Sequence, residues 1–295
     1  MTYRYGPVVA GVDGSPASLG ALRWAADEAC RCTRTLLVVT VRPGDATEPV
    51  ATDVAADAAA EAGRWRVGVA AIAETRRGDP ADVLRELAGG ARLVVVGGRG
   101  AGIGDDRPMG SVSQALGARA DAPVLIVHAA ERWAAPDSVL PRAAPVVTGF
   151  DGSDSGRRAL RLAFEEAAAR GVRLAVIQAW PHPDLWRPGS VRGGDLSAEE
   201  HVARETLDRA TARWHTEYPM VDVEVRTEPG EAVHALVVAS QWAGLLVVGT
   251  RCPADQAQPA NPSVARQVLR YAACPVLVAH GPAGAGEPRA RPAAA

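Results

Sequence analysis

Glycine and serine residues that could wrap an anion are concentrated between residues 97 and 113, in the stretch GGRGAGIGDDRPMGSVS. The stretch follows the apolar run 93–96 and leads into a segment typical of a helix. The first turn of a helix presents N–H groups without partners and the positive end of the helix dipole. Gly110, Ser111 and Ser113 therefore predict a seat for a phosphate group, with backbone N–H groups and hydroxyls as donors.

A carboxylate follows the first apolar run of the chain, at Asp13 in the sequence Val-Asp-Gly-Ser. In an open parallel sheet, ligands bind at the carboxyl ends of the strands, where the strand order reverses. If the first and fourth strands are neighbours, Asp13 faces the same cleft as the glycine stretch and offers an acceptor to the nucleoside end of a nucleotide. The glycines are equally compatible with a flexible surface loop, in which Ser111 would only cap a helix.

Several classes of function are excluded or disfavoured. The sequence contains no lysine, which excludes a Walker-type phosphate loop. The glycines do not follow the first strand as GxGxxG, so a dinucleotide fingerprint fits badly. The four cysteines form no CxxC pair, and no metal site is expected. The net charge of −2 does not indicate a nucleic-acid partner. His128 and His280 are expected to have core or interface roles, and no catalytic constellation stands out.

No apolar run approaches the roughly 18 residues that a membrane span needs. The first residues lack a signal-peptide pattern, so we expect a cytoplasmic protein with no membrane partner.

The chain is an internal repeat. Asp13 returns as Asp151, 138 residues later, whereas Gly97 returns as Gly249, 152 residues later. The second copy thus carries about 14 extra residues, which we place after Pro181. We predict a first domain at 1–129, a linker at 130–144, a second domain at 145–281 and a disordered tail at 282–295.

Each copy alternates strands and helices, and the strands are continuous apolar runs rich in valine. That pattern predicts two doubly wound α/β domains with parallel sheets and right-handed crossovers. In the first copy the expected strands are 8–12, 36–41, about 67–73, 92–97 and 123–128, and the expected helices are 17–31, about 50–64, 80–88 and 111–119. Ser15 and the pair Asp79-Pro80 are expected to begin helices.

The sequence resembles the universal stress protein family over essentially its whole length, as a tandem of two domains. The motifs that carry the resemblance are Val-Asp-Gly-Ser at 12–15, the family's ATP-binding pattern G-x2-G-x9-G-[ST] at Gly97, Gly100, Gly110 and Ser111, and the closing strand at 122–127. The resemblance implies the five-stranded parallel sheet of adenine nucleotide α-hydrolase-like proteins. It also implies that ATP or a related adenine nucleotide is the ligand.

The resemblance further implies roles for individual residues. Asp13 and Val41 would line the adenosine pocket, and Gly97 would lie near the ribose. The phosphates would be held by Gly100, Gly110, Ser111, Val112 and Ser113, with Mg²⁺ as a further component of the site. Family members pair through the last strand, so 123–128 and 275–280 would pair within this chain as a built-in pseudo-dimer, and a homodimer is a further expectation.

The second copy departs from the motif. Cys252 and Pro262 stand where the second and third glycines would be, and Ala179 stands at the Val41 position. A side chain at Cys252 and the missing N–H of Pro262 predict an impaired second site. In the first copy, Asp105 and Asp106 lie inside the loop, where a triphosphate would repel them.

Three functions compete on the sequence alone. The leading hypothesis is an ATP-binding stress or signalling protein whose output is conformational. The second is a slow ATP-hydrolysing or nucleotidyl-transferring enzyme at the same site. The third is a nucleotide-free interaction protein in which the paired domains bind a partner.

Overall fold

The computed structural model describes residues 5–42, 44, 53–100, 109–128, 144–180, 196–250 and 263–280. Several sequence predictions lie outside these residues: the linker at 130–143, the tail at 282–295, the insertion following Pro181, the loop residues Asp105 and Asp106, and the motif departures Cys252 and Pro262. None of the described helices is both long enough and apolar enough to cross a bilayer.

Domain 1 is a parallel α/β unit, as expected from its alternating pattern. Its five strands lie in the order β3-β2-β1-β4-β5. The elements are β1 (Val8–Gly11), α1 (Pro16–Arg31), β2 (Leu36–Arg42), α2 (Val54–Trp65), β3 (Ala71–Arg77), α3 (Pro80–Ala88), β4 (Leu93–Gly97), α4 (Ser111–Ala118) and β5 (Val124–Val127). The strand order reverses between β1 and β4, which is where ligands bind in sheets of this kind.

Domain 2 repeats this arrangement with the strand order β10-β9-β6-β7-β8. The elements are β6 (Val146–Gly149), α6 (Asp154–Arg170), β7 (Leu174–Trp180), α7 (Leu196–Glu217), β8 (Val223–Pro229), α8 (Ala232–Ala239), β9 (Leu245–Gly249), α9 (Val264–Tyr271) and β10 (Val276–Ala279). The two domains therefore have the same fold, a doubly wound five-stranded parallel sheet, and the fold-class prediction is confirmed.

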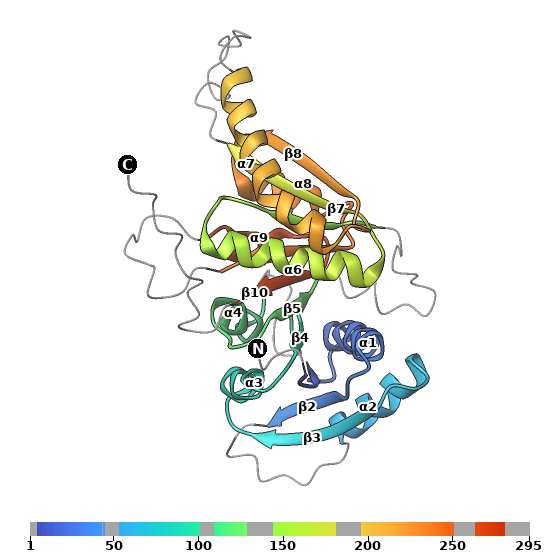
Figure 1. The fold of residues 1–295 in the computed structure, drawn as a ribbon. Coiled ribbons are helices and arrows are strands. Elements are labelled where there is room, and N and C mark those ends of the chain that lie inside the picture. Colours follow the sequence, from blue (N-terminus) through green and yellow to red (C-terminus); the bar gives the residue numbers. More distant parts are fainter. Residues whose placement is uncertain are drawn as a thin grey trace, which may run out of the picture.

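The two sheets join edge to edge into one sheet of ten strands. Strand β5 pairs with β10 in the antiparallel direction, with Leu125 opposite Leu277. Figure 1 shows β5 and β10 at the centre of the molecule, between the blue and cyan strands of domain 1 and the yellow and orange strands of domain 2. This pairing leaves β3 and β8 as the two edges of the joined sheet.

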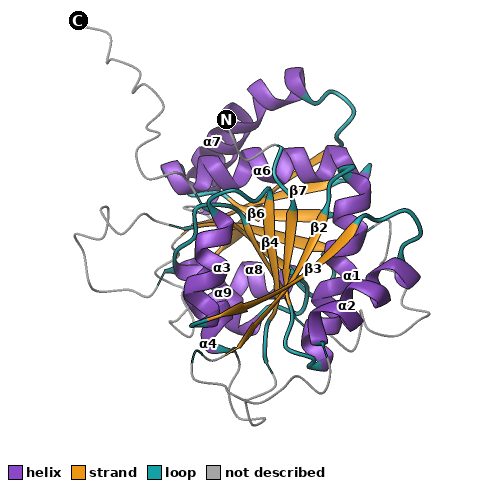
Figure 2. Ribbon diagram, turned by 90° about the horizontal axis from the view of Figure 1, so that it is seen from below, coloured by secondary structure: helices purple, strands orange, loops and turns teal. Residues whose placement is uncertain are grey.

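Helices cover both faces of the joined sheet, and each face has its own core. Helices α1, α2, α6 and α7 pack on one face, where Phe164 and Leu22 are among the largest fully buried side chains. Helices α3, α4, α8 and α9 pack on the other face, around Leu116 and Leu246. Figure 2 shows α1 and α2 on the opposite side of the domain 1 strands from α3 and α4. Strands covered on both faces need apolar residues at every position, which explains the valine runs.

Two elements of domain 1 differ from the prediction: helix α2, predicted at about 50–64, spans Val54–Trp65, and the third strand is shifted as a whole. The prediction of about 67–73 is replaced by Ala71–Arg77. Residues 66–70 instead form a turn in which Gly68 has a positive φ and Val67 is exposed. β3 is an edge strand with exposed polar positions, so its residues lack the apolar run that identified the central strands.

Helix starts follow the predicted capping residues. The Ser15 hydroxyl accepts a hydrogen bond from the N–H of Ser18 at 3.2 Å and begins α1. The Asp79 carboxylate accepts from two N–H groups at the start of α3, with Pro80 as the first helical residue. Both caps satisfy N–H groups that the helix itself leaves without partners.

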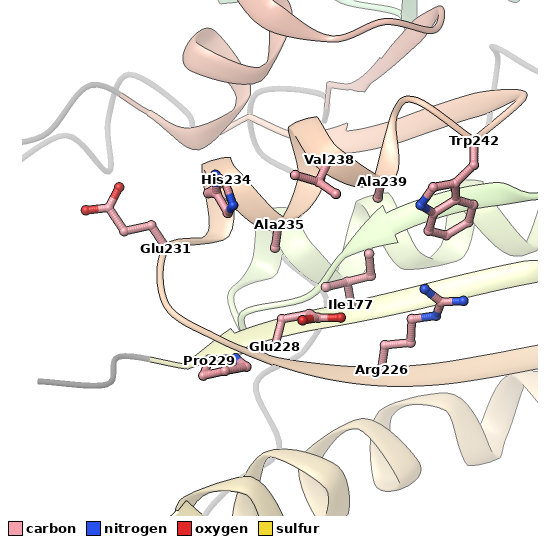
Figure 3. A pocket seen from close by; sticks show the side chains of 10 residues that line it. All are labelled: Ile177, Arg226, Glu228, Pro229, Glu231, His234, Ala235, Val238, Ala239 and Trp242. Atoms are coloured by element: carbon pink, nitrogen blue, oxygen red, sulfur yellow. The ribbon is translucent and has the colours of Figure 1, made fainter. Parts of the chain in front are cut away.

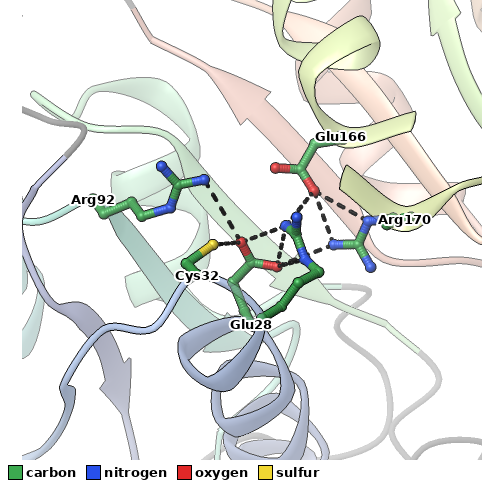
Figure 4. Close-up of polar contacts among 6 residues, drawn as sticks. Glu28, Cys32, Arg92, Glu166 and Arg170 are labelled. Carbon is green, nitrogen blue, oxygen red and sulfur yellow. Dashed lines mark hydrogen bonds and ion pairs between the residues drawn. The ribbon is translucent and has the colours of Figure 1, made fainter. Parts of the chain in front are cut away.

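A buried network of charges joins α1 of domain 1 to α6 of domain 2 (Figure 4). The Arg31 guanidinium lies 2.6 Å from Glu28 and 3.1 Å from Glu166, and the Arg170 guanidinium lies 3.3 Å and 2.9 Å from the same two carboxylates. Cys32 donates its thiol hydrogen to Glu28 at 3.1 Å. Each guanidinium thus bridges the two domains, in a place where unpaired charge would be costly.

The two glutamates occupy equivalent positions but have opposite pKa shifts. Burial raises the pKa of Glu28, but the guanidiniums of Arg31 and Arg170 outweigh burial, and this pKa lies below its ordinary value. Burial and the neighbouring charge of Glu28 raise the pKa of Glu166. Glu28 is therefore the carboxylate whose negative charge the surroundings stabilise more strongly.

Neutralising Glu28 should destabilise the protein more than neutralising Glu166. We expect Glu28→Gln to lower the free energy of unfolding by about 3 kcal/mol, because it removes a negative charge that balances the buried guanidinium groups. Glu166→Gln should cost about 1 kcal/mol, because burial and the charge of Glu28 already oppose the charge of this carboxylate, so less is lost when it is replaced by a neutral group.

Urea denaturation of the two variants at pH 7 measures the difference. Glu205→Gln is the control: Glu205 pairs with Arg209 on the exposed face of α7, and its loss should cost less than about 0.5 kcal/mol. Equal decreases in the free energy of unfolding for Glu28→Gln and Glu166→Gln would contradict the predicted difference between the two carboxylates.

Candidate functional site

The structure brings Asp13 and the glycine stretch together. Strands β1 and β4 are parallel neighbours, with Ala10 paired to Val95, so their carboxyl ends lie at the same edge of the sheet. Asp13 follows β1 and Gly100 follows β4. A Cβ atom placed on Gly100 would lie only 2.7 Å from Oδ2 of Asp13. The loops after the first and fourth strands therefore converge, as the sequence predicted for neighbouring strands.

The turn that carries Asp13 is fixed by its own hydrogen bonds. Oδ1 of Asp13 accepts from the N–H of Ser15 at 3.0 Å, and Gly14 adopts a φ of 80°, a conformation that favours glycine. These contacts use one carboxylate oxygen and turn the other, Oδ2, toward Gly100. The Asp13 side chain is exposed.

Two hydrogen bonds tie the end of β4 to the beginning of α4. The Ser113 hydroxyl donates to the carbonyl of Gly97 at 2.6 Å, and the N–H of Gly110 donates to the carbonyl of Gly98 at 2.8 Å. A hydroxyl has one hydrogen to donate. The sequence prediction that Ser113 offers its hydroxyl to a phosphate therefore differs from the structure, in which that hydrogen holds the base of the loop together.

Gly97 lies where α1 crosses the strand end. A Cβ atom on Gly97 would approach the backbone of Ala17 to 2.8 Å, so only glycine lets β4 and α1 come this close. The same packing recurs in domain 2, where a Cβ atom on Gly249 would lie 2.2 Å from the carbonyl oxygen of Ser155. These two glycines have a packing reason to be present, independent of any ligand.

The N-terminus of α4 is open within the described part of the chain. Gly110 is its N-cap and has no side chain, and no described side chain caps the helix. Ser111 is exposed and Val112 is half-buried, whereas Gly110 and Ser113 are buried, so one side of the first turn is exposed. The N–H groups of this turn retain the hydrogen-bonding capacity that a phosphate requires.

Val41 lies near the end of β2, next to the Asp13 turn. Gly11 pairs with Val39, and continuing that register places Val41 level with Asp13 on the adjacent strand. Val41 is half-buried and packs against the core beneath α3. This edge of the sheet thus places an apolar side chain next to the turn that carries a carboxylate.

Domain 2 has a different helix start at the equivalent position. Helix α9 begins at Val264, one residue later than α4, and its N-cap is Ser263. The Ser263 hydroxyl accepts from the N–H of Arg266 at 3.3 Å. A hydroxyl that caps its own helix uses an N–H group that in α4 stays available. The Arg158 guanidinium also reaches into this region and donates to the carbonyl of Thr250 at 3.1 Å.

Two histidines stand at the boundary between the domains, beside these loops. Nε2 of His128 lies 2.6 Å from the carbonyl oxygen of Leu269 in α9 of the other domain. Nδ1 of His280 lies 3.1 Å from the hydroxyl of Thr250. The sequence marked both positions as equivalent strand ends with a core or interface role. Their contacts across the boundary could not be read from it.

A pocket of about 140 Å³ lies in domain 2, between α8 and the strands β7 and β8 (Figure 3). None of the predicted site residues lines it. Its lining residues are Ile177, Arg226, Glu228, Pro229, Glu231, His234, Ala235, Val238, Ala239 and Trp242. The Arg226 guanidinium lies over the Trp242 ring at 4.7 Å and pairs with Glu224 at 2.7 Å. The cation of this pocket is already engaged by its neighbours.

No group of three histidine, cysteine, aspartate or glutamate side chains among the described residues could hold a metal ion.

Acid should weaken the fold through His280. Burial lowers the pKa of His280 from 6.5 to about 4, and the nearby Arg158 acts in the same direction. As the pH falls below 6.5 the unfolded chain takes up a proton that the folded chain resists. The free energy of unfolding should therefore fall between pH 6.5 and about 4, by about 3 kcal/mol in total from this residue.

Chemical denaturation at pH 7, 6 and 5 measures this loss, and His280→Gln should flatten it. His201→Gln, which changes an exposed histidine on α7, is the matched control and should leave the slope unchanged. An unaltered slope in His280→Gln would contradict the assignment.

Comparisons with known proteins agree with this architecture. The sequence matches the universal stress protein family over residues 4–128 and 144–280. A universal stress protein of Mycobacterium tuberculosis strain H37Rv is 32% identical over 300 residues, which cover 92% of this chain and 95% of the relative. A universal stress protein from Archaeoglobus fulgidus DSM 4304 shares the fold, with a TM-score of 0.65 and 20% identity, over 92% of this chain and 97% of that chain.

Shorter members of the same family have been solved with nucleotides. A universal stress protein from Archaeoglobus fulgidus in complex with dAMP is 29% identical, has a TM-score of 0.34, and covers 45% of this chain and 95% of that chain. Another, in complex with cAMP, is 32% identical, has a TM-score of 0.35, and covers 47% of this chain and 98% of that chain. With two matched domains and a relative of equal layout at 32% identity, this chain belongs to the universal stress protein family.

Proposed function

We propose that domain 1 binds one adenine nucleotide, with ATP as the main ligand, and that the protein acts in stress response or signalling through a nucleotide-dependent conformation. The observation that carries the proposal is the convergence of Asp13 and Gly100 at the end of β4, together with the uncapped N-terminus of α4, which is hydrogen-bonded to the same strand end. Asp13 would supply an acceptor for the nucleoside, and the first turn of α4 would supply donors for the phosphates.

The phosphates would bind at the first turn of α4. The N–H groups of Ser111, Val112 and Ser113 belong to this turn, and the Ser111 hydroxyl is exposed beside them. Gly110 and Gly100 leave room for the phosphate chain to approach the backbone. Ser113 contributes through its N–H, because its hydroxyl is bonded to Gly97.

The adenosine group would lie across the ends of β1 and β2. The Asp13 carboxylate, whose Oδ2 faces Gly100, would accept a hydrogen bond from a hydroxyl or amino group of the nucleoside, and Val41 would contact an apolar face of the ligand. Gly97 would lie beneath the ligand, at the point where the end of β4 packs against α1. Mg²⁺, if it accompanies ATP, would be held chiefly by the phosphate oxygens.

Domain 2 would serve mainly as a structural partner. Ser263 caps the N-terminus of α9, and the Arg158 guanidinium donates a hydrogen bond to the carbonyl of Thr250 after β9. The antiparallel pairing of β5 with β10 would then act as a built-in pseudo-dimer. Location in the cytoplasm, further dimerisation and the limits of the two domains stay predictions.

Removing the carboxylate of Asp13 should weaken nucleotide binding. We expect Asp13→Ala to lower the affinity for ATP at least about tenfold, because a hydrogen bond to a charged group contributes about 1.5–3 kcal/mol. Asp151→Ala, the equivalent change in domain 2, is the matched control and should leave the affinity and a stoichiometry of one nucleotide per chain unchanged.

Isothermal titration with ATP, in the presence and absence of Mg²⁺, measures both quantities on the full chain. Equal affinities for wild type and Asp13→Ala would refute the site. Absence of binding in the wild type would instead favour the nucleotide-free interaction protein, and steady phosphate release above the Asp13→Ala background would favour the slow enzyme.

Two glycine substitutions should separate folding from binding. Gly97→Ala should destabilise the protein, because its Cβ atom would meet the rigid backbone of Ala17. Gly100→Ala should leave the melting temperature within about 2 °C, because its Cβ atom meets only the end of the Asp13 side chain. It should nevertheless weaken ATP binding by displacing that carboxylate.

Thermal unfolding followed by titration of each variant tests the contrast. Unchanged ATP affinity in Gly100→Ala would remove Gly100 from the site, whatever the result at Gly97.

A further inference from the structure

His128 links the candidate site of domain 1 to the body of domain 2. The residue follows β5, at the strand that joins the two sheets. Its Nε2 atom lies 2.6 Å from the carbonyl oxygen of Leu269, which belongs to α9 of domain 2. A carbonyl oxygen can only accept, so Nε2 carries the hydrogen. The ring therefore has a fixed orientation, set by a helix of the other domain.

The same ring supports the turn that begins the glycine loop. A Cβ atom placed on Gly98 would lie 3.4 Å from Cδ2 of His128, so the ring lies beside the backbone of this turn. Gly98 also donates its N–H to Val127 at 2.9 Å and accepts from Gly110 at 2.8 Å. The turn is thus held by the neighbouring strand, by the start of α4 and by the ring of His128.

Domain 2 contacts α4 directly at a second place. A Cβ atom on Gly117 would lie 2.8 Å from Cδ1 of Leu269, so α4 packs closely against the residue whose carbonyl accepts from His128. The arrangement is reciprocal, because the ring of His280 is influenced by the carbonyl of Leu116 in α4. Both the turn after β4 and helix α4 therefore pack against domain 2.

The surroundings of His128 disfavour the charged form of its imidazole. Burial lowers the pKa of His128, and the positive charge of Arg99 acts in the same direction, whereas the carbonyls of Leu269 and Ile126 oppose them. The contact with Leu269 requires a hydrogen on Nε2.

We propose that His128 is a positioning residue through which domain 2 holds the Gly97–Gly98 turn and the start of α4 in the geometry that the domain 1 site needs. This inference rests on the proposed nucleotide site for its functional consequence, but the positioning itself is a property of the ligand-free chain. It gives domain 2 a role that does not depend on its own loop binding anything.

Hydrogen exchange of the full-length, nucleotide-free protein tests the positioning. In His128→Ala, we expect the amides of 97–100 and of 264–271 to exchange about tenfold faster, the change expected for loss of one buried hydrogen bond. The amides of β2 should keep their rates, which shows that the fold is intact. In His128→Gln the side-chain amide can still donate to Leu269, so a large part of the protection should return.

His280→Ala is the matched control, because it removes the equivalent ring without touching Gly98, and the amides of 97–100 should keep their wild-type rates.

Titration of the same variants with ATP gives the second readout. We expect His128→Ala to weaken ATP binding about tenfold and His128→Gln to weaken it less than threefold. Unchanged exchange at 97–100 in His128→Ala would overturn the proposal, as would an equal effect of His280→Ala on that turn. A wild-type protein that binds no ATP would refute the proposed function, while the exchange rates would still decide whether His128 positions the turn.

Discussion

The antiparallel pairing of β5 with β10 is the constraint on which the rest of the molecule depends. Each domain ends its own parallel sheet with a short, fully buried strand, which would leave an apolar edge exposed if the domains separated. The pairing closes that edge and sets the distance between the helices on both faces. The charge network between α1 and α6 on one face, and the contacts between α4 and α9 on the other, form only because this pairing fixes the register.

The sequence predicted the position of an element well wherever a single physical requirement, such as burial on both faces or helix capping, determines it. The central strands were found because strands buried on both faces must be apolar, and α3 was placed at its observed bounds because Asp79 and Pro80 begin a helix in only one way. The edge strand β3 was misplaced because its second half is polar or charged and several of its residues are exposed, so it lacks an apolar run. Its position depends on pairing with β2, which is information that its own residues do not contain.

The candidate site was predictable for a similar reason. Once two strands are known to be parallel neighbours, the residues after their carboxyl ends must meet, and Asp13 and Gly100 do so. The contact of His128 with Leu269 spans 141 residues and joins a ring to a backbone carbonyl, an acceptor that every residue type possesses. No residue pattern can signal such a partner. Only the repetition of histidine at the two strand ends pointed toward the boundary.

The two domains show how a repeat can keep its fold while its sites diverge. Gly97 and Gly249 are both required where a helix crosses a strand end, so packing alone preserves them. The cap of the following helix is under no such constraint: Gly110 leaves the first turn of α4 open, whereas Ser263 closes that of α9 with its own hydroxyl. A change of cap alters the capacity to bind an anion at little cost to the fold. The glycine at the strand end is therefore weak support for a ligand, and the openness of the helix that follows is the feature that separates the two domains.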